Sequence, residues 1–128
     1  CNSENISNLR KIFSKAKIVI QKKQTGTADA ILCAKQYIIN KDILILFGDV
    51  PLITVKSIKK LINKFYENKS IGSMIAFNSN TPFGYGRVKT KNLFIESIVE
   101  ENSATVLEKK IGLCNSGVII CNSKLLFK

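Results

Sequence analysis

An unbroken apolar run at residues 43–47, ILILF, followed at once by GDVP, constrains the fold of this chain more than any other stretch. Five large apolar side chains without polar alternation are typical of a strand covered on both faces, as in a parallel sheet flanked by helices. Gly48 then permits a sharp turn, and Asp49 places a carboxylate at the carboxyl edge of the predicted sheet, where open α/β folds bind ligands. A second interpretation stays open for Asp49, because aspartate is also a common turn-capping residue.

The residues before this run complete a strand–helix–strand unit. The sequence predicts a strand at residues 17–21 (KIVIQ), a helix at residues 27–39 and the next strand at residues 42–47. Strands joined through one helix should be parallel, with a right-handed crossover. The loops that follow the two strands should therefore share one crevice at the carboxyl edge of the sheet, with Gly26 in one loop and Asp49 in the other.

Helical and strand patterns continue along the rest of the chain. They predict a helix capped by Thr54, a strand at residues 72–77, a hairpin of residues 87–90 and 93–101, and a strand at residues 115–121. The predicted fold class is therefore α/β, with a mostly parallel central sheet flanked by helices. With 128 residues the chain makes one domain at most, and because it begins at Cys1 and not at methionine, we expect an internal part of a longer polypeptide, incomplete at both ends.

Charge and hydrophobicity narrow the classes of partner. The net charge of +11 would favour nucleic-acid binding only if the basic side chains gathered on one face together with aromatic residues. Lysines are instead scattered along nearly every segment, and Arg10 and Arg87 are the only arginines, so we expect a small anionic ligand and no nucleic-acid partner. No apolar run approaches the ~20 residues that span a bilayer, so no membrane partner is expected.

The cysteine and histidine content excludes several kinds of site. The four cysteines show no C-x-x-C spacing and the chain has no histidine, which rules out a Cys/His zinc site. The lack of histidine also excludes every catalytic scheme with an imidazole base. Cys33 and Cys121 are most simply buried free thiols, which suit a reducing cytoplasm.

Five motifs stand in a characteristic order along residues 15–125. They are VIQKKQTGTADAIL, DILILFGDVPLI, TPFGYGRV, SIVEE followed by SAT, and CNSGVII. With these motifs the chain resembles the uridylyltransferase (pyrophosphorylase) domain of the bacterial bifunctional N-acetylglucosamine-1-phosphate uridylyltransferases, which also acetylate glucosamine-1-phosphate. The resemblance implies a Rossmann-like nucleotide-diphospho-sugar transferase core. Its substrates would be UTP and N-acetylglucosamine-1-phosphate, and its products pyrophosphate and UDP-N-acetylglucosamine, a precursor of peptidoglycan and lipopolysaccharide.

The resemblance also implies roles for residues in the two predicted loops. Gln21, Gln24, Gly26 and Thr27 are implied to form the loop that reads uracil, where side-chain amides can match the donors and acceptors of the base. Asp49 is implied to be the catalytic carboxylate and the ligand of a Mg²⁺ cofactor, since Mg²⁺ prefers hard oxygen donors and contacts substrate phosphates. A simpler interpretation stays open for Gln21, as a solvated side chain at a strand end.

A second set of residues is implied to bind the substrates. Phe47 and Gly48 belong to the strand end that carries the implied metal ligand. Gly86 in GYGR, Glu100 in IVEE and Asn115 in CNSG are implied to hold the amino sugar. The alternative for Glu100 is an ordinary surface position, because the glutamate beside it could be the exposed partner of a lysine. The tyrosine and the arginine of GYGR are assigned structural roles.

The chain departs from the family pattern in ways that bear on activity. It does not contain the glycine-rich LAAGxGTRM segment that cradles the triphosphate, the downstream asparagine that shares the metal, or the hexapeptide-repeat domain that acetylates and forms a homotrimer. Phe47 stands where the family commonly has tyrosine, and Glu101 where it commonly has histidine. We therefore expect these 128 residues alone to be inactive. Two alternatives stay open: transfer to a different sugar-1-phosphate, or a nucleotide-sugar-binding module without catalysis.

Overall fold

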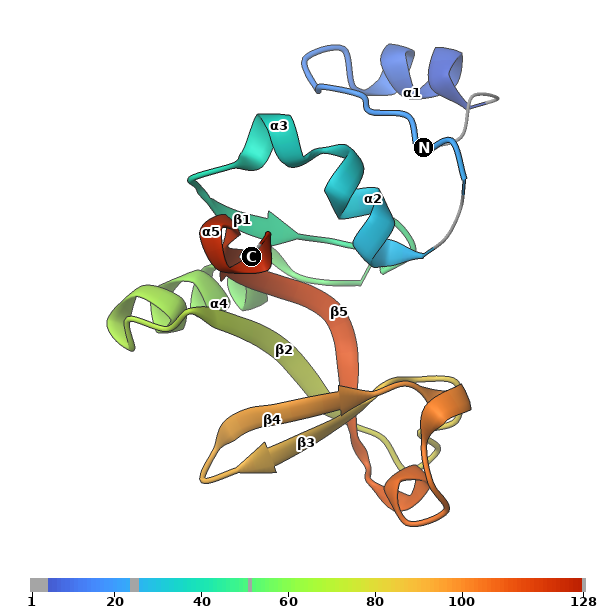
Figure 1. Ribbon diagram of the computed structural model, residues 1–128, viewed down its shortest axis with the longest axis vertical. Coiled ribbons are helices and arrows are strands. Elements are labelled where there is room, and N and C mark those ends of the chain that lie inside the picture. Colours follow the sequence, from blue (N-terminus) through green and yellow to red (C-terminus); the bar gives the residue numbers. More distant parts are fainter. Residues whose placement is uncertain (1–4, 24–25, 51, 128) are drawn as a thin grey trace. The chain divides into compact units, whose positions relative to one another are not determined.

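The computed structural model describes residues 5–23, 26–50 and 52–127. The described residues form two compact units, one containing those up to Asp42 and from Ser123 onwards, the other containing those within Ile43–Asn122. The elements follow in this order (Figure 1): α1 Ile6–Ile12, α2 Thr27–Cys33, α3 Lys35–Ile38, β1 Asp42–Ile45, α4 Val55–Glu67, β2 Gly72–Asn78, β3 Arg87–Lys91, β4 Phe94–Val99, the 3₁₀ turns η1 Glu101–Ser103 and η2 Glu108–Lys110, β5 Leu113–Asn122 and α5 Ser123–Leu126. None of the described helices is long and apolar enough to cross a lipid bilayer.

The first unit is largely helical. The helix predicted over residues 27–39 forms as two shorter helices, α2 and α3, which meet at Ala34. Two distant parts of the chain also meet in this unit, because the backbone N–H of Lys41 donates to Ser123 Oγ at 2.9 Å and the N–H of Ser123 donates to the Lys41 carbonyl at 2.9 Å. Ser123 is fully buried at this junction, where α5 begins.

The second unit is built on a sheet in which β5 is central. The strands lie in the order β1–β5–β3–β4, and β2 also pairs with β5. β2 and β3 run antiparallel to β5, and β3 pairs antiparallel with β4 in the hairpin at one end of the unit (Figure 1). Lys91 pairs with Phe94, so the turn of the hairpin consists of Asn92 and Leu93, which have positive φ angles of 51° and 67°.

The predicted α/β class is confirmed, but the prediction of a mostly parallel sheet is wrong. The three pairings described above are antiparallel, and residues 17–21, predicted as a strand, belong to no helix or strand. The physical reason is that an unbroken apolar run indicates burial on both faces and not strand direction. In residues 17–21 the apolar side chains are only partly covered, with Ile20 46% exposed, so β-propensity alone does not make a strand there.

The core of the second unit lies between α4 and the sheet. Thr54 caps α4, as predicted, by accepting a hydrogen bond at 3.1 Å from the backbone N–H three residues further on. One face of α4 then contributes Leu61 and Phe65, which pack with Val118 and Ile120 of β5. This packing holds β5 in place on the helix side of the sheet.

The apolar run at residues 43–47 is less covered than the sequence predicts. Ile43 is the one buried residue of the run, and Leu46 is 47% exposed. β1 ends at Ile45, two residues before the predicted strand end. The prediction of burial on both faces is therefore wrong for this run, and among the described strands β1 ends the strand order, with β5 as its neighbour.

Candidate active site

The predicted site residues are divided between the two units. Gln21, Gly26 and Thr27 lie in the first unit, and Gln24 lies outside the described residues. The second unit holds the other six, namely Phe47, Gly48, Asp49, Gly86, Glu100 and Asn115. The crevice predicted between Gly26 and Asp49 joins residues of both units and stays a prediction.

Three predicted residues from separate segments come together in the second unit as the Gly86–Glu100–Asn115 cluster. A Cβ atom at position 86, just before β3, would lie 3.1 Å from Glu100 Oε1 and 3.2 Å from Oε2. The backbone N–H of Asn115 on β5 donates to the Gly86 carbonyl at 2.8 Å. Gly86 is buried, whereas Glu100 is exposed and its carboxylate forms no hydrogen bond or ion pair with another described residue. The cluster therefore presents a carboxylate to solvent beside a fixed stretch of backbone.

A β-bulge shapes the part of β5 that carries this cluster. Residues 116–118 stand opposite the single residue Ile75 of β2. Ser116 Oγ donates to the Ile75 carbonyl at 2.6 Å, and the Gly117 N–H donates to Asn115 Oδ1 at 2.8 Å, so polar groups in the bulge find partners. Gly117 has a φ of 75°, in the left-handed region that favours glycine. The bulge thus fixes the orientation of the Asn115 side chain.

Gly117 also receives the ring of Phe47 from the end of β1. A Cβ atom at position 117 would lie 2.4 Å from Phe47 Cδ2 and 2.5 Å from Cε2, so a side chain there would overlap the ring. The N–H of Val50 donates to the Phe47 carbonyl at 3.4 Å and closes the turn that carries Gly48 and Asp49. Contacts therefore run without a break from this turn to the bulge and from the bulge to the Gly86–Glu100–Asn115 cluster.

Asp49 is exposed in that turn, so its carboxylate is open to a ligand from solvent. Within the described part of the chain, no group of three or more His, Cys, Asp or Glu side chains is arranged to hold a metal ion. A single carboxylate nevertheless suits Mg²⁺, which commonly keeps several waters and is held by one or two carboxylates together with substrate phosphates. Gly48 does not have a positive φ, contrary to the expectation of a glycine-dependent turn, and a Cβ there would have no other atom within 4 Å. Position 48 is thus open to a ligand.

The buried Arg87 and the partly buried Glu101 form an ion pair next to the cluster in sequence. Arg87 is 1% exposed, and its Nη2 lies 2.7 Å from Glu101 Oε2. Its Nη1 donates to the Tyr85 carbonyl, while the Gly84 N–H donates to Glu101 Oε2 at 3.1 Å. The hydrogen bond from Arg87 is the main reason that the pKa of Glu101 lies below its usual value. Glu101 is thus mainly the partner of Arg87, with Lys109 Nζ 3.6 Å from its Oε1, and the structural role predicted for Arg87 agrees with this arrangement.

In the first unit, Gln21 closes the loop that was predicted to read uracil. Its Nε2 donates to the Gly26 carbonyl at 3.1 Å and to Asp29 Oδ2 at 2.8 Å. Gly26 has a φ of 119°, and Thr27 is the first residue of α2. Gln21 does not stand at a strand end, and its side chain, partly exposed, forms these two hydrogen bonds.

Comparison with known proteins identifies the family of this fold and site. The nucleotidyl transferase family matches residues 2–125 of the chain. The chain belongs to that family. The resemblance indicated by the five motifs is thereby confirmed, because relatives of this nucleotidyl transferase include bifunctional GlmU proteins.

Two relatives show how much of a nucleotidyl transferase the chain represents. The bifunctional protein GlmU of Fervidobacterium nodosum is 39% identical over 113 residues, which cover 88% of this chain and 25% of that protein. A protein of Acanthamoeba polyphaga mimivirus, named as a probable UDP-N-acetylglucosamine pyrophosphorylase, is 37% identical over 116 residues, or 88% of this chain and 46% of that protein. The chain thus spans between a quarter and a half of the length of these relatives.

A solved structure supports the fold of the nucleotidyl transferase. The crystal structure of a UDP-glucose pyrophosphorylase with UDP-glucose matches 96% of this chain and 50% of that chain, with a TM-score of 0.64 and 19% sequence identity. At that level of identity the likeness concerns the fold alone. It supports the Rossmann-like core expected from the resemblance.

Sequence reasoning missed two residues that shape the nucleotidyl transferase site. Gly117 seats the ring of Phe47, and Asp29 accepts a hydrogen bond from Gln21. A signal was available for Gly117, because an isolated glycine inside a strand pattern suggests a bulge. Asp29 carried no signal beyond its place in the first turn of a helix.

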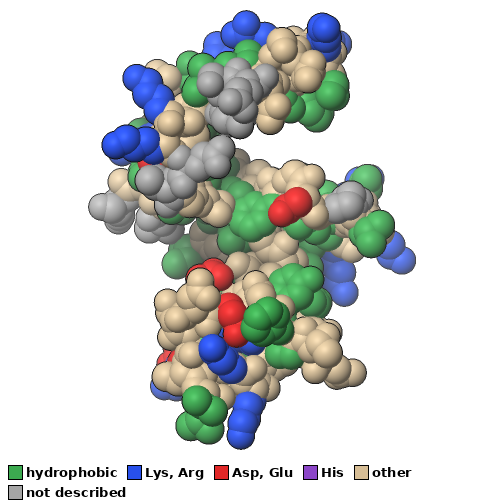
Figure 2. Space-filling view, turned by 90° about the vertical axis from the view of Figure 1, so that its right-hand side faces the viewer, with side chains coloured by type: hydrophobic (Ala, Val, Ile, Leu, Met, Phe, Trp, Pro, Cys, Tyr) green, Lys and Arg blue, Asp and Glu red, His purple; other side chains and the backbone are tan. Residues whose placement is uncertain are grey.

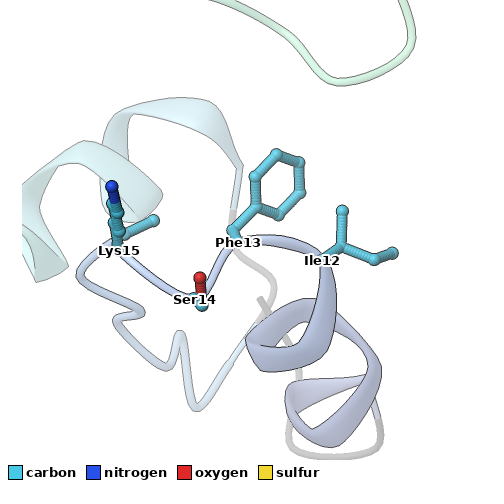
Figure 3. Close-up of a pocket in the computed structure, with 5 residues that line it drawn as sticks. Ile12, Phe13, Ser14 and Lys15 are labelled. Atoms are coloured by element: carbon cyan, nitrogen blue, oxygen red, sulfur yellow. The ribbon is translucent and has the colours of Figure 1, made fainter.

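Two other surface features lie apart from the site residues. On the face shown in Figure 2, Lys and Arg side chains lie in small separate groups and not in one broad patch. An open hollow at the end of α1 is lined by residues 12–16, and Figure 3 shows Ile12 and Phe13 projecting beside it. The hollow includes none of the predicted site residues.

Proposed function

We propose that the protein containing this chain transfers UMP from UTP to N-acetylglucosamine-1-phosphate, which gives UDP-N-acetylglucosamine and pyrophosphate. Membership of the nucleotidyl transferase family supports transfer of a nucleotidyl group. The relative named as a UDP-N-acetylglucosamine pyrophosphorylase supports both the uridylyl group and the amino sugar. The GYGR and IVEE motifs, which carry Gly86 and Glu100, favour the same sugar.

The observation that carries the proposal is the Gly86–Glu100–Asn115 cluster. Three segments far apart in the sequence meet at the ends of β3 and β4 and on β5. The exposed Glu100 carboxylate is an acceptor for sugar hydroxyl groups, and charge-assisted hydrogen bonds of this kind are the strong ones. Because position 86 has no side chain, the Glu100 carboxylate can lie beside the backbone there, where it would face the sugar.

The chemistry needs positioning and not a general base from this chain. The phosphate of a sugar-1-phosphate is already ionised near neutral pH, so its oxygen can attack the α-phosphorus of UTP while pyrophosphate leaves. The cluster would hold the sugar so that the phosphate points at the nucleotide, which converts a bimolecular encounter into an oriented one. Asp49 would hold Mg²⁺, which when bound supplies positive charge to the phosphate oxygens.

The first unit supplies the nucleotide contacts in this proposal. The Gln21 amide is bound to both Gly26 and Asp29, which fixes the orientation of the Gln21 side chain. A fixed side chain loses less conformational entropy on binding than a loose one. Gln21, Gln24, Gly26 and Thr27 are proposed to contact uracil.

A pyrophosphate-release assay on the complete protein tests the proposal. With UTP and Mg²⁺, N-acetylglucosamine-1-phosphate should give a kcat/KM at least about tenfold above that for glucose-1-phosphate, a difference of about 1.4 kcal/mol in transition-state binding. Preference for another sugar phosphate would change the proposed substrate. Binding of UDP-N-acetylglucosamine without any pyrophosphate release would instead support a non-catalytic binding module.

Other expectations from the resemblance are not part of this proposal and stay predictions. They concern a longer protein with the triphosphate cradle, a homotrimer formed through an acetyltransferase domain, a cytoplasmic location and a role in cell-wall precursor synthesis. The 128 residues alone are expected to be inactive, because losing even one charge-stabilising donor costs roughly 10²–10³ in rate. Pyrophosphate release by this chain alone would contradict that expectation.

A further inference from the structure

We propose that Glu101 is a positioning residue: with Arg87 it clamps the backbone of residues 84–86 in the shape that the sugar phosphate requires. This inference rests on the proposed function. It assigns to the second glutamate of IVEE a role different from that of the first. Glu100 would touch the sugar, whereas Glu101 would act on the sugar only through the backbone that it holds.

The hydrogen bonds of the pair converge on the loop. Glu101 Oε2 accepts from the Gly84 N–H at 3.1 Å and from Arg87 Nη2 at 2.7 Å. Arg87 Nη1 donates to the carbonyl of Tyr85, which lies between Gly84 and Gly86 in the sequence. Two consecutive backbone positions are therefore tied to one ion pair, immediately before Gly86.

The pairing of β3 with β4 places this clamp directly beside the cluster. Arg87 pairs with Val99 in the ladder, so the residue before Arg87 faces the residue after Val99. These two are Gly86 and Glu100, and a Cβ atom at position 86 would lie 3.1 Å from Glu100 Oε1. Gly86 and Glu100 are thus the chain neighbours of Arg87 and Glu101, the two residues of the ion pair.

Burial makes the clamp stiff. Arg87 is 1% exposed, and the Glu101 side chain is 15% exposed. Removing one partner of a buried pair leaves an uncompensated charge, which is strongly unfavourable. Lys109 is a weaker partner of Glu101, since it lies at 3.6 Å and is 49% exposed. Two hydrogen bonds to this pair restrict the backbone of Gly84 and Tyr85, as a pre-organised binding site needs.

The segment after Glu101 offers a matched control. Lys89 and Glu108 form another ion pair between β3 and the same connection, at 3.1 Å. Glu108 also accepts from the Thr105 N–H and hydroxyl, but no bond from it to residues 84–86 is found among the described residues. Glu108→Gln should therefore remove an ion pair without loosening the loop before Gly86.

The experiment combines amide hydrogen exchange with kinetics on the complete protein. Glu101→Ala should speed the exchange of the Gly84 N–H by about tenfold or more, because its acceptor is lost. It should raise KM for N-acetylglucosamine-1-phosphate by about tenfold and leave KM for UTP within about twofold of wild type. Glu101→Gln, which keeps an acceptor oxygen, should show a smaller change in both, and Glu108→Gln should show neither.

The two readouts also separate this inference from the proposed function. Unchanged Gly84 exchange in Glu101→Gln and Glu101→Ala overturns the clamp, as does an equal rise of both KM values. If Glu101→Ala does not fold, Glu101→Gln carries the same comparison. If the wild-type protein shows no turnover, the proposed function fails. The clamp is then judged by hydrogen exchange alone: faster exchange of the Gly84 N–H in the Glu101 variants supports it, and unchanged exchange overturns it.

Discussion

At the scale of single residues, two glycines decide where side chains of the site can lie. Gly86 leaves room for the Glu100 carboxylate, and Gly117 leaves room for the Phe47 ring. The GYGR motif pointed to the first of these from sequence. The second could not be assigned in the same way, because its role depends on a positive φ and on a ring brought from a distant strand end. Both properties arise from tertiary structure.

Gly117→Ala should destabilise the protein and displace Phe47. A non-glycine residue at φ 75° is strained by roughly 1–3 kcal/mol, and the new Cβ would also overlap the ring. Gly72→Ala is the control, since a Cβ there meets only ordinary contacts at 3.6 Å and 3.7 Å. Urea unfolding measures both. In the double variant Phe47→Ala/Gly117→Ala, removal of the ring should make the loss smaller than the sum of the single losses; strict additivity would contradict the contact.

Asp49→Asn should show whether Asp49 acts as a metal ligand or only as a turn residue. The amide has nearly the same shape and Asp49 is exposed, so the melting temperature should stay close to that of wild type. Turnover of the complete protein should fall by about 10²–10³-fold or more, with a weaker dependence on Mg²⁺, because a neutral amide is a poorer ligand for a hard cation. Asparagine also serves well in turns. Near-normal turnover in a folded variant would therefore leave Asp49 as a turn residue only.

At the scale of elements, sequence patterns that reflect local structure gave more correct predictions than patterns used to infer how strands pair. Thr54 and the apolar stripe after it predicted α4, because a cap and a 3.6-residue period are both local. Alternation predicted the β3–β4 hairpin, although its turn lies one residue later than expected. The strand at residues 17–21 and the parallel sheet were wrong, since pairing partners and strand direction are set by distant segments.

Leu93→Gly should stabilise the β3–β4 hairpin. Leu93 has a φ of 67° and is 99% exposed, and its two-residue turn needs positive φ at both positions. Relief of about 1–2 kcal/mol of backbone strain, less about 0.5–1 kcal/mol for the flexibility of glycine in the unfolded chain, gives a net gain of up to about 1.5 kcal/mol. Thermal unfolding would measure it. Leu93→Ala keeps the Cβ and should give little gain; an equal gain in both variants would mean that exposed leucine, and not strain, is the cause.

Glu108 should make stability depend on pH at the low end. Hydrogen bonds from the Thr105 backbone, from the Thr105 hydroxyl and from Lys89 lower the pKa of Glu108 from 4.5 to about 2. A depressed pKa in the folded state means that the stabilisation is full above the unfolded pKa of 4.5 and is lost as pH falls towards about 2. The stability difference between wild type and Glu108→Gln should therefore be constant from neutral pH down to about 5 and shrink below that. Urea unfolding of both proteins across this range checks it, and a difference independent of pH would contradict it.

At the scale of the whole molecule, the predicted site residues are divided between two units. The resemblance predicted the three residues of the cluster, because each stands in a recognisable motif. It could not predict the contact of Phe47 with Gly117 or the pairing of Arg87 with Glu101, since these depend on which segments the sheet brings together. Gln21, which is proposed to contact the nucleotide, belongs to the other unit.

The most direct test of the proposed site is the effect of Glu100→Gln on the two substrates of the complete protein. Glu96→Gln is the control, because Glu96 is also an exposed glutamate on β4, the strand that leads to Glu100. Glu100→Gln should raise KM for N-acetylglucosamine-1-phosphate by about 10- to 100-fold, the loss of about 1.4–2.8 kcal/mol from one charge-assisted hydrogen bond, with KM for UTP unchanged. Glu96→Gln should change neither KM. An unchanged KM for the sugar phosphate in Glu100→Gln would contradict the assignment of the Gly86–Glu100–Asn115 cluster as the sugar site.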